Sequence, residues 1–199
     1  TSTFVFGSVA ELEGYLEGRP GYLYSRYDNP TVVAVEQKIA AVDGAEASLA
    51  FASGMAAVST AILGLLAAGD EVVCCAAIYG GTYHLLHDLA PRFGIQVRFA
   101  TLEEFRTPET LAGPATKMVW FESPINPTLR CVDVRAVAAA CRKAGVLSVV
   151  DNTFASPINQ PVLAMGVDLS MQSVTKYLNG HSDVTGGVLS GGREVIGRL

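Results

Sequence analysis

The stretch Ser173-Val-Thr-Lys-Tyr-Leu-Asn-Gly-His-Ser-Asp-Val-Thr-Gly-Gly187 carries the most informative residues of the chain. Lys176 comes directly after an apolar, strand-like run, and hydroxyls and glycines surround it. Lysine is rarely buried unless it is paired or used covalently, and desolvation lowers the pKa of an amine and makes it nucleophilic. The hydroxyls of Ser173 and Thr175 could donate hydrogen bonds to a phosphate. A solvated lysine at a strand end is the alternative, and the spacing alone leaves both interpretations open.

Strand-like and helix-like segments alternate along the rest of the chain. After an irregular segment at 1–27, Asn29-Pro30 is a typical helix cap followed by a first-turn proline. Helices are predicted at 31–42, 55–67, 82–90 and 134–144. Strands are predicted at 47–52, 71–77, 96–100, 117–121, 147–150, 169–174 and 187–190. The alternation indicates an α/β fold with a mostly parallel sheet covered by helices on both faces, and such sheets bind ligands beyond the carboxyl ends of their strands.

The composition is typical of a globular chain. Its 199 residues are 50 % hydrophobic and 17 % charged, which is enough apolar material for one sizeable core. The formal net charge is −5 and no Lys/Arg block occurs, which argues against nucleic acid as a partner. The most apolar run, 55–68, contains Ser59 and Thr60 and is too short to cross a bilayer. The start of the chain lacks the basic region of a secretory signal, so no membrane contact is expected.

The cysteines and histidines predict neither a disulfide framework nor a metal site. No C-x-x-C pair occurs among Cys74, Cys75, Cys131 and Cys141. This usage fits a reduced, cytoplasmic compartment. His84 and His87 share a helical face, but no cysteine or carboxylate completes a ligand set, so no metal is expected.

Two strand ends early in the chain carry candidate ligand-binding residues. Ser53-Gly54-Met55 lies between a strand and a helix, where backbone N–H groups can cup a phosphate and glycine leaves room for close approach. Many α/β turns look similar, so this junction is weak support when taken alone. Tyr79 follows the next strand, and Gly80-Gly81 beside it favours an open turn that faces a ligand. A core tyrosine is the alternative.

Two later strand ends carry polar residues. Asn126, in Glu122-Ser-Pro-Ile-Asn-Pro-Thr128, follows a buried-type strand, although asparagine before Pro127 is also common in turns. Glu122 is expected to support this loop. Asp151 ends a fully apolar strand, where a carboxylate should be paired with a cation. A structural aspartate bonded to backbone N–H groups is the alternative.

Tyr24-Ser-Arg26, near the start of the chain, places an arginine two residues after a tyrosine. The arginine fork suits a phosphate dianion and the phenol adds a donor. An arginine exposed in a surface loop is the alternative.

The lysine stretch resembles the lysine motif of the pyridoxal 5'-phosphate (PLP) enzymes of Cys/Met metabolism. That family includes cystathionine γ-synthase, cystathionine γ-lyase, O-acylhomoserine sulfhydrylase and methionine γ-lyase. The similarity runs in colinear order along nearly the whole chain, through the segments around Tyr24, Ser53, Tyr79, Asn126 and Asp151. It implies the large domain of the PLP-dependent transferase fold (fold type I, aspartate aminotransferase-like).

The resemblance assigns a cofactor role to each of these residues. Lys176 is expected to bond covalently to PLP and to move the Cα proton of the substrate, and Tyr79 is expected to stack on the ring and assist proton transfer. Asn126 is expected to bond the phenolic oxygen of PLP, and Asp151 the protonated ring nitrogen. The full set implied to bind the cofactor is Tyr24, Arg26, Ser53, Gly54, Met55, Tyr79, Asn126, Asp151, Ser173, Thr175 and Lys176.

The reactions implied are γ-replacement or γ-elimination on sulfur amino acids or activated homoserine esters, with β-elimination as a further possibility. Methionine γ-lyases usually carry a cysteine two residues after the stacking tyrosine, and here that position is Gly81. This departure argues against methionine γ-lyase. The cystathionine enzymes and the sulfhydrylases stay open.

The resemblance also predicts how the chain is organised. Residues 1–30 are expected to form an N-terminal segment whose Tyr24 and Arg26 serve the cofactor of a neighbouring subunit, and residues 31–199 the PLP-binding large domain. A homo-oligomer, dimer or tetramer, with shared sites follows. Family members begin with a longer N-terminal arm and continue into a smaller C-terminal domain that carries the carboxylate-binding arginine, and this chain is expected to lack both.

Three readings of different class therefore stay open. The first is a working lyase or transferase, completed by a homo-oligomer or a complementary subunit. The second is a non-catalytic PLP-binding or assembly subunit whose site is completed by another chain. The third, a nucleotide-binding α/β protein, is disfavoured because no G-x-G-x-x-G follows the first strand.

Overall fold

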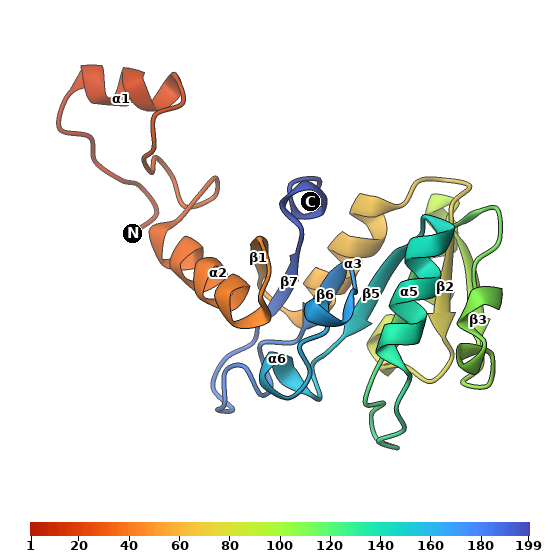
Figure 1. Ribbon diagram of the computed structural model, residues 1–199. Helices are drawn as coiled ribbons and strands as arrows, with labels where there is room; N and C mark the ends of the chain where they lie inside the picture. The colour runs from red at the N-terminus through yellow and green to blue at the C-terminus, as the bar shows by residue number, and fades with distance from the viewer.

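Seven strands form one sheet in the order β1-β7-β6-β5-β4-β2-β3 in the computed structural model, which describes residues 1–199 (Figure 1). The strands are β1 (Ala47–Phe51), β2 (Glu71–Cys75), β3 (Gln96–Ala100), β4 (Thr116–Glu122), β5 (Leu147–Asp151), β6 (Leu169–Gln172) and β7 (Gly187–Gly191). The pairs from β3 through β2, β4 and β5 to β6 are all parallel, whereas β7 is antiparallel to both β6 and β1. Six strands therefore run in one direction, as the mostly parallel prediction requires, and their carboxyl ends share one edge of the sheet.

The helices follow the predicted alternation with the strands. They are α1 (Val9–Leu16), α2 (Pro30–Asp43), α3 (Gly54–Leu65), α4 (Gly80–His84), α5 (Val134–Ala144), α6 (Ser156–Asn159) and α7 (Arg193–Ile196). Short 3-10 or π-helical turns occupy Leu85–Leu89, Ala90–Phe93, Glu104–Arg106, Pro108–Thr110 and Leu163–Met165. The predicted cap of α2 is confirmed, because the Asn29 side chain accepts a hydrogen bond from the N–H of Thr31 and Gly44 ends the helix at φ 68°.

Two predictions of local structure were wrong. The segment 1–27 is not irregular throughout, because it contains α1, where the Ser8 side chain accepts a hydrogen bond from the N–H of Glu11. Serine followed three residues later by glutamate is a helix-start signal that the prediction overlooked. The helix predicted at 82–90 begins at Gly80 as α4 and changes to a π-helical turn at Leu85–Leu89.

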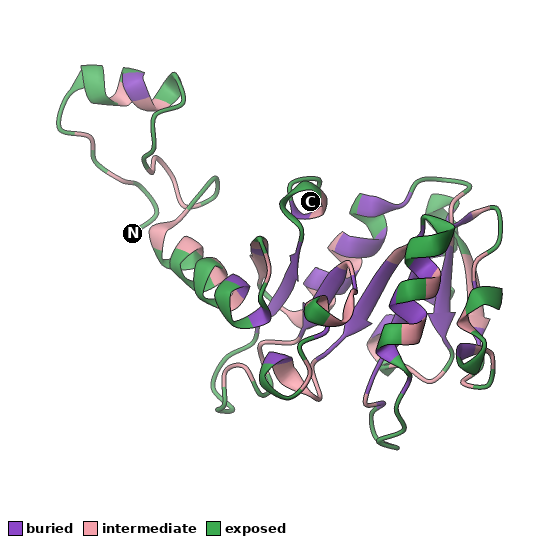
Figure 2. Ribbon diagram, in the orientation of Figure 1, coloured by how far each residue is buried: buried purple, intermediate pink, exposed green.

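Each face of the sheet has its own apolar core. Alternate residues of a strand point to opposite faces, so Val72 and Cys74 pack with α3 whereas Val73 and Cys75 pack with α5. The central strands β2, β4, β5, β6 and β7 are mostly buried, whereas most residues of the edge strands β1 and β3 are half-buried (Figure 2). Each large side chain that is fully buried in these cores contributes roughly 1.5–3 kcal/mol of burial free energy, and together they fix the strand ends in place. No helix of the molecule has the length and apolar content needed to cross a membrane.

Residues 1–29 lie apart from the sheet and its helices, as Figure 1 shows at the red end of the chain. This segment is held by its own contacts, a bridge between Thr3 and Tyr24 and an aromatic pair of Phe4 and Tyr22 with ring centroids 5.7 Å apart. Most of its residues are exposed, including Val5 at 96 % (Figure 2). The segment therefore offers an apolar surface that the rest of the chain does not cover.

Candidate functional site

A cavity of about 1190 Å³ opens at the edge where the parallel strands end. It lies where ligands of such sheets are expected. Nine of the eleven residues predicted to bind the cofactor line it: Ser53, Gly54, Met55, Tyr79, Asn126, Asp151, Ser173, Thr175 and Lys176. The sequence-based interpretation therefore converges on one place in the molecule, although the individual roles remain predictions.

Asp151 is placed by strand register at the centre of this edge. It is the last residue of β5 and pairs with Glu122 of β4 on one side and Met171 of β6 on the other. Only 5 % of its surface is exposed. Its Oδ1 accepts hydrogen bonds from the backbone N–H of Thr153, at 3.1 Å, and from the Thr153 hydroxyl, at 2.6 Å.

No cationic side chain of this chain neutralises Asp151. It forms no ion pair, its Oδ2 accepts no hydrogen bond, and burial raises the pKa of the carboxyl despite the two bonds from Thr153. A buried carboxylate that lines a cavity and has no ion-pair partner is well suited to bind a positively charged group of a ligand. The protonated ring nitrogen of PLP is such a group, so this residue fits the cofactor.

Glu122 is a second buried carboxylate beside Asp151. Its Oε2 accepts a hydrogen bond from the N–H of Tyr79 at 2.9 Å, and its Oε1 one from the N–H of Asn126 at 2.5 Å. Burial, with a smaller contribution from the charge of nearby Asp151, raises the pKa of Glu122 to about 7. The expectation that Glu122 supports the Asn126 loop agrees with these bonds, and its bond to Tyr79 was not foreseen.

The turn Ser53-Gly54-Met55 begins α3 at the cavity. The Ser53 hydroxyl accepts the N–H of Ala56, and the other first-turn N–H groups of a helix have no partner within it. A Cβ added at Gly54 would come 3.0 Å from the Ser173 Oγ, so the turn and Ser173 lie against each other. The free N–H groups, the helix dipole and a neighbouring hydroxyl suit a phosphate, which is the second part of PLP that this cavity fits.

The two hydroxyls that flank Lys176 are used differently. Thr175 already exchanges two hydrogen bonds with Gly186, accepting its N–H at 3.0 Å and donating to its carbonyl oxygen at 3.2 Å. Ser173 donates its N–H to the Thr153 hydroxyl at 2.8 Å, and no protein group takes up its own hydroxyl. Ser173 is therefore free to donate to a phosphate, whereas Thr175 would have to give up its bond to Gly186.

Lys176 lines the cavity together with Asp151 but is exposed. This exposure agrees with the solvated lysine at a strand end, which the spacing left open as the alternative. The covalent role of Lys176 stays a prediction.

Tyr79 stands at the start of α4 with 49 % of its surface exposed. A Cβ at Gly81 would come 2.6 Å from the Tyr79 ring and 2.9 Å from the Met55 sulfur. The glycine therefore allows the ring to lie beside Met55 at the cavity wall. Gly80 and Gly81 form the first turn of α4 and not an open turn, and the ligand-facing role of Tyr79 stays a prediction.

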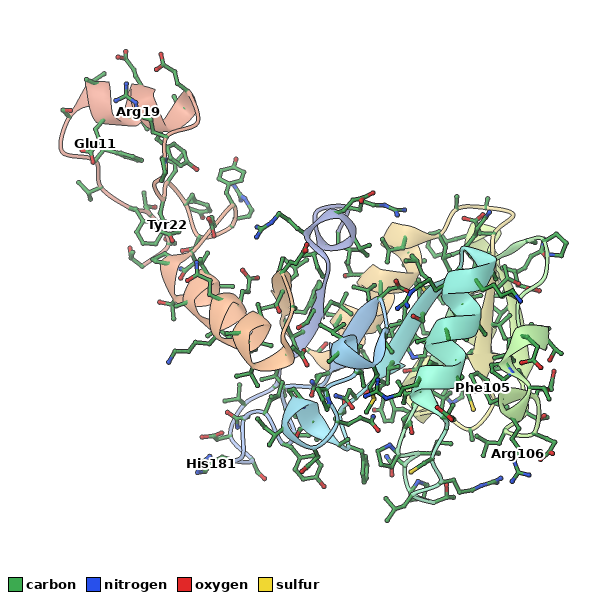
Figure 3. All side chains as sticks on the ribbon, in the orientation of Figure 1. Glu11, Arg19, Tyr22, Phe105, Arg106 and His181 are labelled. Carbon is green, nitrogen blue, oxygen red and sulfur yellow. The ribbon has the colours of Figure 1, made fainter.

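Tyr24 and Arg26 are not among the residues that line the cavity. The Arg26 guanidinium lies over the rings of Tyr24 and Tyr27, 4.8 Å and 5.5 Å from their centroids. Figure 3 labels Tyr22 in the same segment and His181 at the cavity, and the two lie well apart. Within one chain the segment does not reach the cavity.

Thr153 is the residue that sequence reasoning missed. Its hydroxyl donates to Asp151 at 2.6 Å and accepts the N–H of Ser173 at 2.8 Å, which ties the ends of β5 and β6 together. The signal was a threonine two residues after a strand-end aspartate, a spacing that favours a local hydrogen bond. The loop after the lysine also lines the cavity, through Tyr177, Gly180, His181, Ser182, Asp183, Val184 and Thr185. No group of three or more His, Cys, Asp or Glu side chains is placed to hold a metal ion.

Comparisons with known proteins show the family of the chain. The sequence profile of the family described as Cys/Met metabolism PLP-dependent enzyme matches residues 1–198. L-methionine gamma-lyase of Pseudomonas putida is 39% identical over 200 residues, which cover 100% of this chain and 50% of that protein. Cystathionine gamma-lyase of Homo sapiens is 43% identical over 195 residues, which cover 96% of this chain and 48% of that protein.

Solved structures show the fold. The crystal structure of metB from Corynebacterium glutamicum matches with a TM-score of 0.90 at 37% identity, covering 100% of this chain and 50% of that chain. This match confirms the predicted fold class. The chain spans about half the length of the relatives that it matches.

Proposed function

The chain belongs to the Cys/Met metabolism PLP-dependent enzyme family, and from this premise we propose that it catalyses γ-elimination or γ-replacement on a sulfur amino acid or an activated homoserine ester. Asp151 carries the proposal. An aspartate that is only 5 % exposed, lines the cavity and forms no ion pair calls for a positively charged ligand group. Lys176 lines the same cavity and supplies the amine that a PLP aldehyde needs.

Different residues of the cavity would bind different groups of the cofactor. Asp151 would bind the protonated ring nitrogen, the turn at Ser53-Gly54-Met55 and Ser173 the phosphate, and Asn126 the phenolic oxygen. When bound, PLP supplies an electron-withdrawing ring that stabilises negative charge at the substrate Cα.

Lys176 and Tyr79 would do the proton transfers. Lys176 would hold the cofactor covalently, and its amine, once released by the substrate amine, would take the proton from Cα and return it nearby. Tyr79 would lie against the ring and hold the proton that the leaving group needs. Gly81 leaves room for this tyrosine at the cavity wall. Methionine γ-lyases usually carry a cysteine at the position of Gly81, so the glycine favours cystathionine or an activated homoserine ester over methionine as the substrate.

The proposal extends to a homo-oligomer, dimer or tetramer, in which residues 1–30 of one copy serve the large domain, residues 31–199, of another. Tyr24 and Arg26 have the chemistry of a phosphate clamp but lie outside the cavity of their own chain. The exposed apolar residues of this segment, among them Val5, Val9 and Leu16, support its packing on a partner. A cytoplasmic location is also proposed, since all four cysteines are free thiols and fit a reducing compartment.

Reconstitution with PLP tests the proposal. The purified chain should acquire the visible absorbance of lysine-bound PLP, and Lys176→Ala should not. Cystathionine or O-acylhomoserine added to the reconstituted chain, alone or with a co-purifying partner, should change that spectrum and release product. A coloured chain whose spectrum no such substrate changes would indicate a non-catalytic PLP-binding or assembly subunit instead.

Mixing two defective variants tests the shared site. Arg26→Ala and Lys176→Ala chains each lose part of every site in a homo-oligomer. Mixed oligomers should regain some sites with both residues intact, so PLP-binding capacity should rise above that of either variant alone. A mixture that binds no more PLP than the separate variants would contradict sharing between copies.

A further inference from the structure

Glu122 connects the two loops that carry the residues assigned to the cofactor ring. Tyr79 follows β2 and Asn126 follows β4, and they come from different parts of the chain. One carboxylate accepts a backbone N–H from each, at 2.9 Å for Tyr79 and 2.5 Å for Asn126. Each of its two oxygens is used by one loop, so the position of one loop fixes that of the other.

Burial of the Glu122 carboxylate costs folding free energy. The residue is 3 % exposed and forms no ion pair. Asp151 of β5 and the thiols of Cys74 and Cys75 of β2 act on Glu122 through their charge, and Arg130, which acts on Cys75, forms no ion pair with Glu122. A buried carboxylate without a cation costs folding free energy that its hydrogen bonds offset only in part, and here those bonds come only from the main chain at Tyr79 and Asn126.

We propose that Glu122 is a positioning residue for the cofactor, which holds Tyr79 and Asn126 in a fixed place beside the ring through one hydrogen bond to each main chain. The inference rests on the proposed PLP site. Glu122 also lines the cavity, but both of its carboxylate oxygens are taken up by the N–H groups of Tyr79 and Asn126, so it acts through these two residues.

The chemistry of the side chain explains why a carboxylate is needed. Two N–H donors converge on it, and only a carboxylate accepts through both of its terminal atoms. Glutamine has the same shape but offers one acceptor and one donor, so its NH2 group would face a backbone N–H. Glu122→Gln therefore releases one of the two loops while it preserves size and removes a buried charge, which favours retention of the fold.

Equilibrium binding of PLP to Glu122→Gln tests the inference. Losing one charge-assisted hydrogen bond should weaken PLP binding by about tenfold. The visible circular dichroism of bound PLP, per mole bound, should fall as well, because the ring is held less firmly by Tyr79 and Asn126. Loss of stability alone would not change this signal per bound cofactor.

The matched control is Glu71→Gln. Glu71 starts β2 at the opposite end of the sheet and accepts the hydroxyl of Thr116. The same substitution there should leave both PLP affinity and the circular dichroism signal at their wild-type values. If Glu122→Gln also matches the wild type in both measurements, Glu122 does not position the cofactor.

A measurement on the unsubstituted chain keeps the test independent of any variant's folding. The amide protons of Tyr79 and Asn126 should exchange slowly with solvent and their resonances should titrate together as Glu122 ionises. Rapid exchange of both amides would overturn the inference even if PLP binds. A wild-type chain that binds no PLP but shows both protected amides would instead refute the proposed function and leave the Glu122 bonds intact.

Discussion

Asp151 and Thr153 show how single residues prepare a charged site. The Thr153 hydroxyl and N–H both donate to one oxygen of the Asp151 carboxylate and leave the other oxygen to the cavity. The same hydroxyl accepts the N–H of Ser173, so the carboxylate and the residue expected at the phosphate are tied by one side chain. Pre-organisation of this kind lowers the cost of ordering the site when a ligand binds.

Asp151→Asn should weaken PLP binding by about tenfold or more, because the amide keeps the size of the side chain but not its negative charge. The measurement is the dissociation constant of PLP, followed by visible absorbance. Asp43→Asn is the matched control, since Asp43 is equally buried, at 3 % exposed, but lies away from the cavity beside Ser170 and Gln172. Equal affinities of Asp151→Asn and the wild type would show that the carboxylate faces no cationic group.

The identity of the polar strand-end residues could be read from the sequence, but their partners could not. Asp151 was found because a carboxylate after a fully apolar strand needs a partner. The bond from Tyr79 to Glu122 spans 43 positions of the chain and depends on the order of β2 and β4 in the sheet. No local pattern encodes that order, so the hydrogen bond from the Tyr79 N–H to Glu122 could be found only in the structure.

At the scale of elements, helix α4 begins with two glycines, Gly80 and Gly81, that differ in how closely other side chains pack against them. A Cβ at Gly81 would strike the ring of Tyr79 and the sulfur of Met55, whereas a Cβ at Gly80 would meet no atom within 4 Å. Neither glycine has positive φ, so backbone strain does not distinguish them. The difference lies in what packs against the start of the helix.

Gly81→Ala should therefore displace Tyr79 and Met55 from the cavity wall and weaken PLP binding by several-fold, on the order of 1 kcal/mol. Gly80→Ala in the same helix turn should leave the affinity within about twofold of the wild type. Both variants are compared by PLP titration after their folded state is checked by circular dichroism. Equal losses in the two variants would mean that the Tyr79 ring does not contribute to binding.

The strands and helices were predicted to within a few residues because apolar strand runs and caps such as Asn29-Pro30 are local signals. The direction of β7 was not predicted. A buried strand is apolar or small whether it pairs in parallel or antiparallel fashion, and all five residues of β7 are buried. Its direction follows from the loop 173–186, which returns the chain to the same edge of the sheet after β6.

At the scale of the whole molecule, three buried carboxylates set how stability depends on pH. Burial raises the pKa of Asp43, Glu122 and Asp151, and that of Glu122 rises from an ordinary value of 4.5 to about 7. A raised pKa in the folded state stabilises the fold fully below the unfolded value, and this contribution is lost as the pH rises through the folded value. The exposed Asp88 and the half-buried Glu104 have lowered pKa values, so they act in the opposite sense, but only at more acidic pH.

The cofactor-free chain should therefore lose stability as the pH rises from about 4.5 to about 7, with Glu122 alone accounting for up to about 3 kcal/mol. Denaturant unfolding at pH values across this window measures the effect. Glu122→Gln cannot ionise and should flatten the dependence. A wild-type chain that becomes more stable across the same window would contradict the assignment of buried, unneutralised carboxylates.

Covalent trapping of PLP on Lys176 tests the central claim most directly. The chain is mixed with one equivalent of PLP, reduced with borohydride so that the lysine adduct becomes permanent, digested and mapped by peptide mass spectrometry. The chain contains four lysines, Lys38, Lys117, Lys143 and Lys176, so the three others serve as internal controls. The account predicts that the added mass lies on the peptide with Lys176 and disappears in Lys176→Ala. Label on the other lysines alone, or none at all, would contradict it.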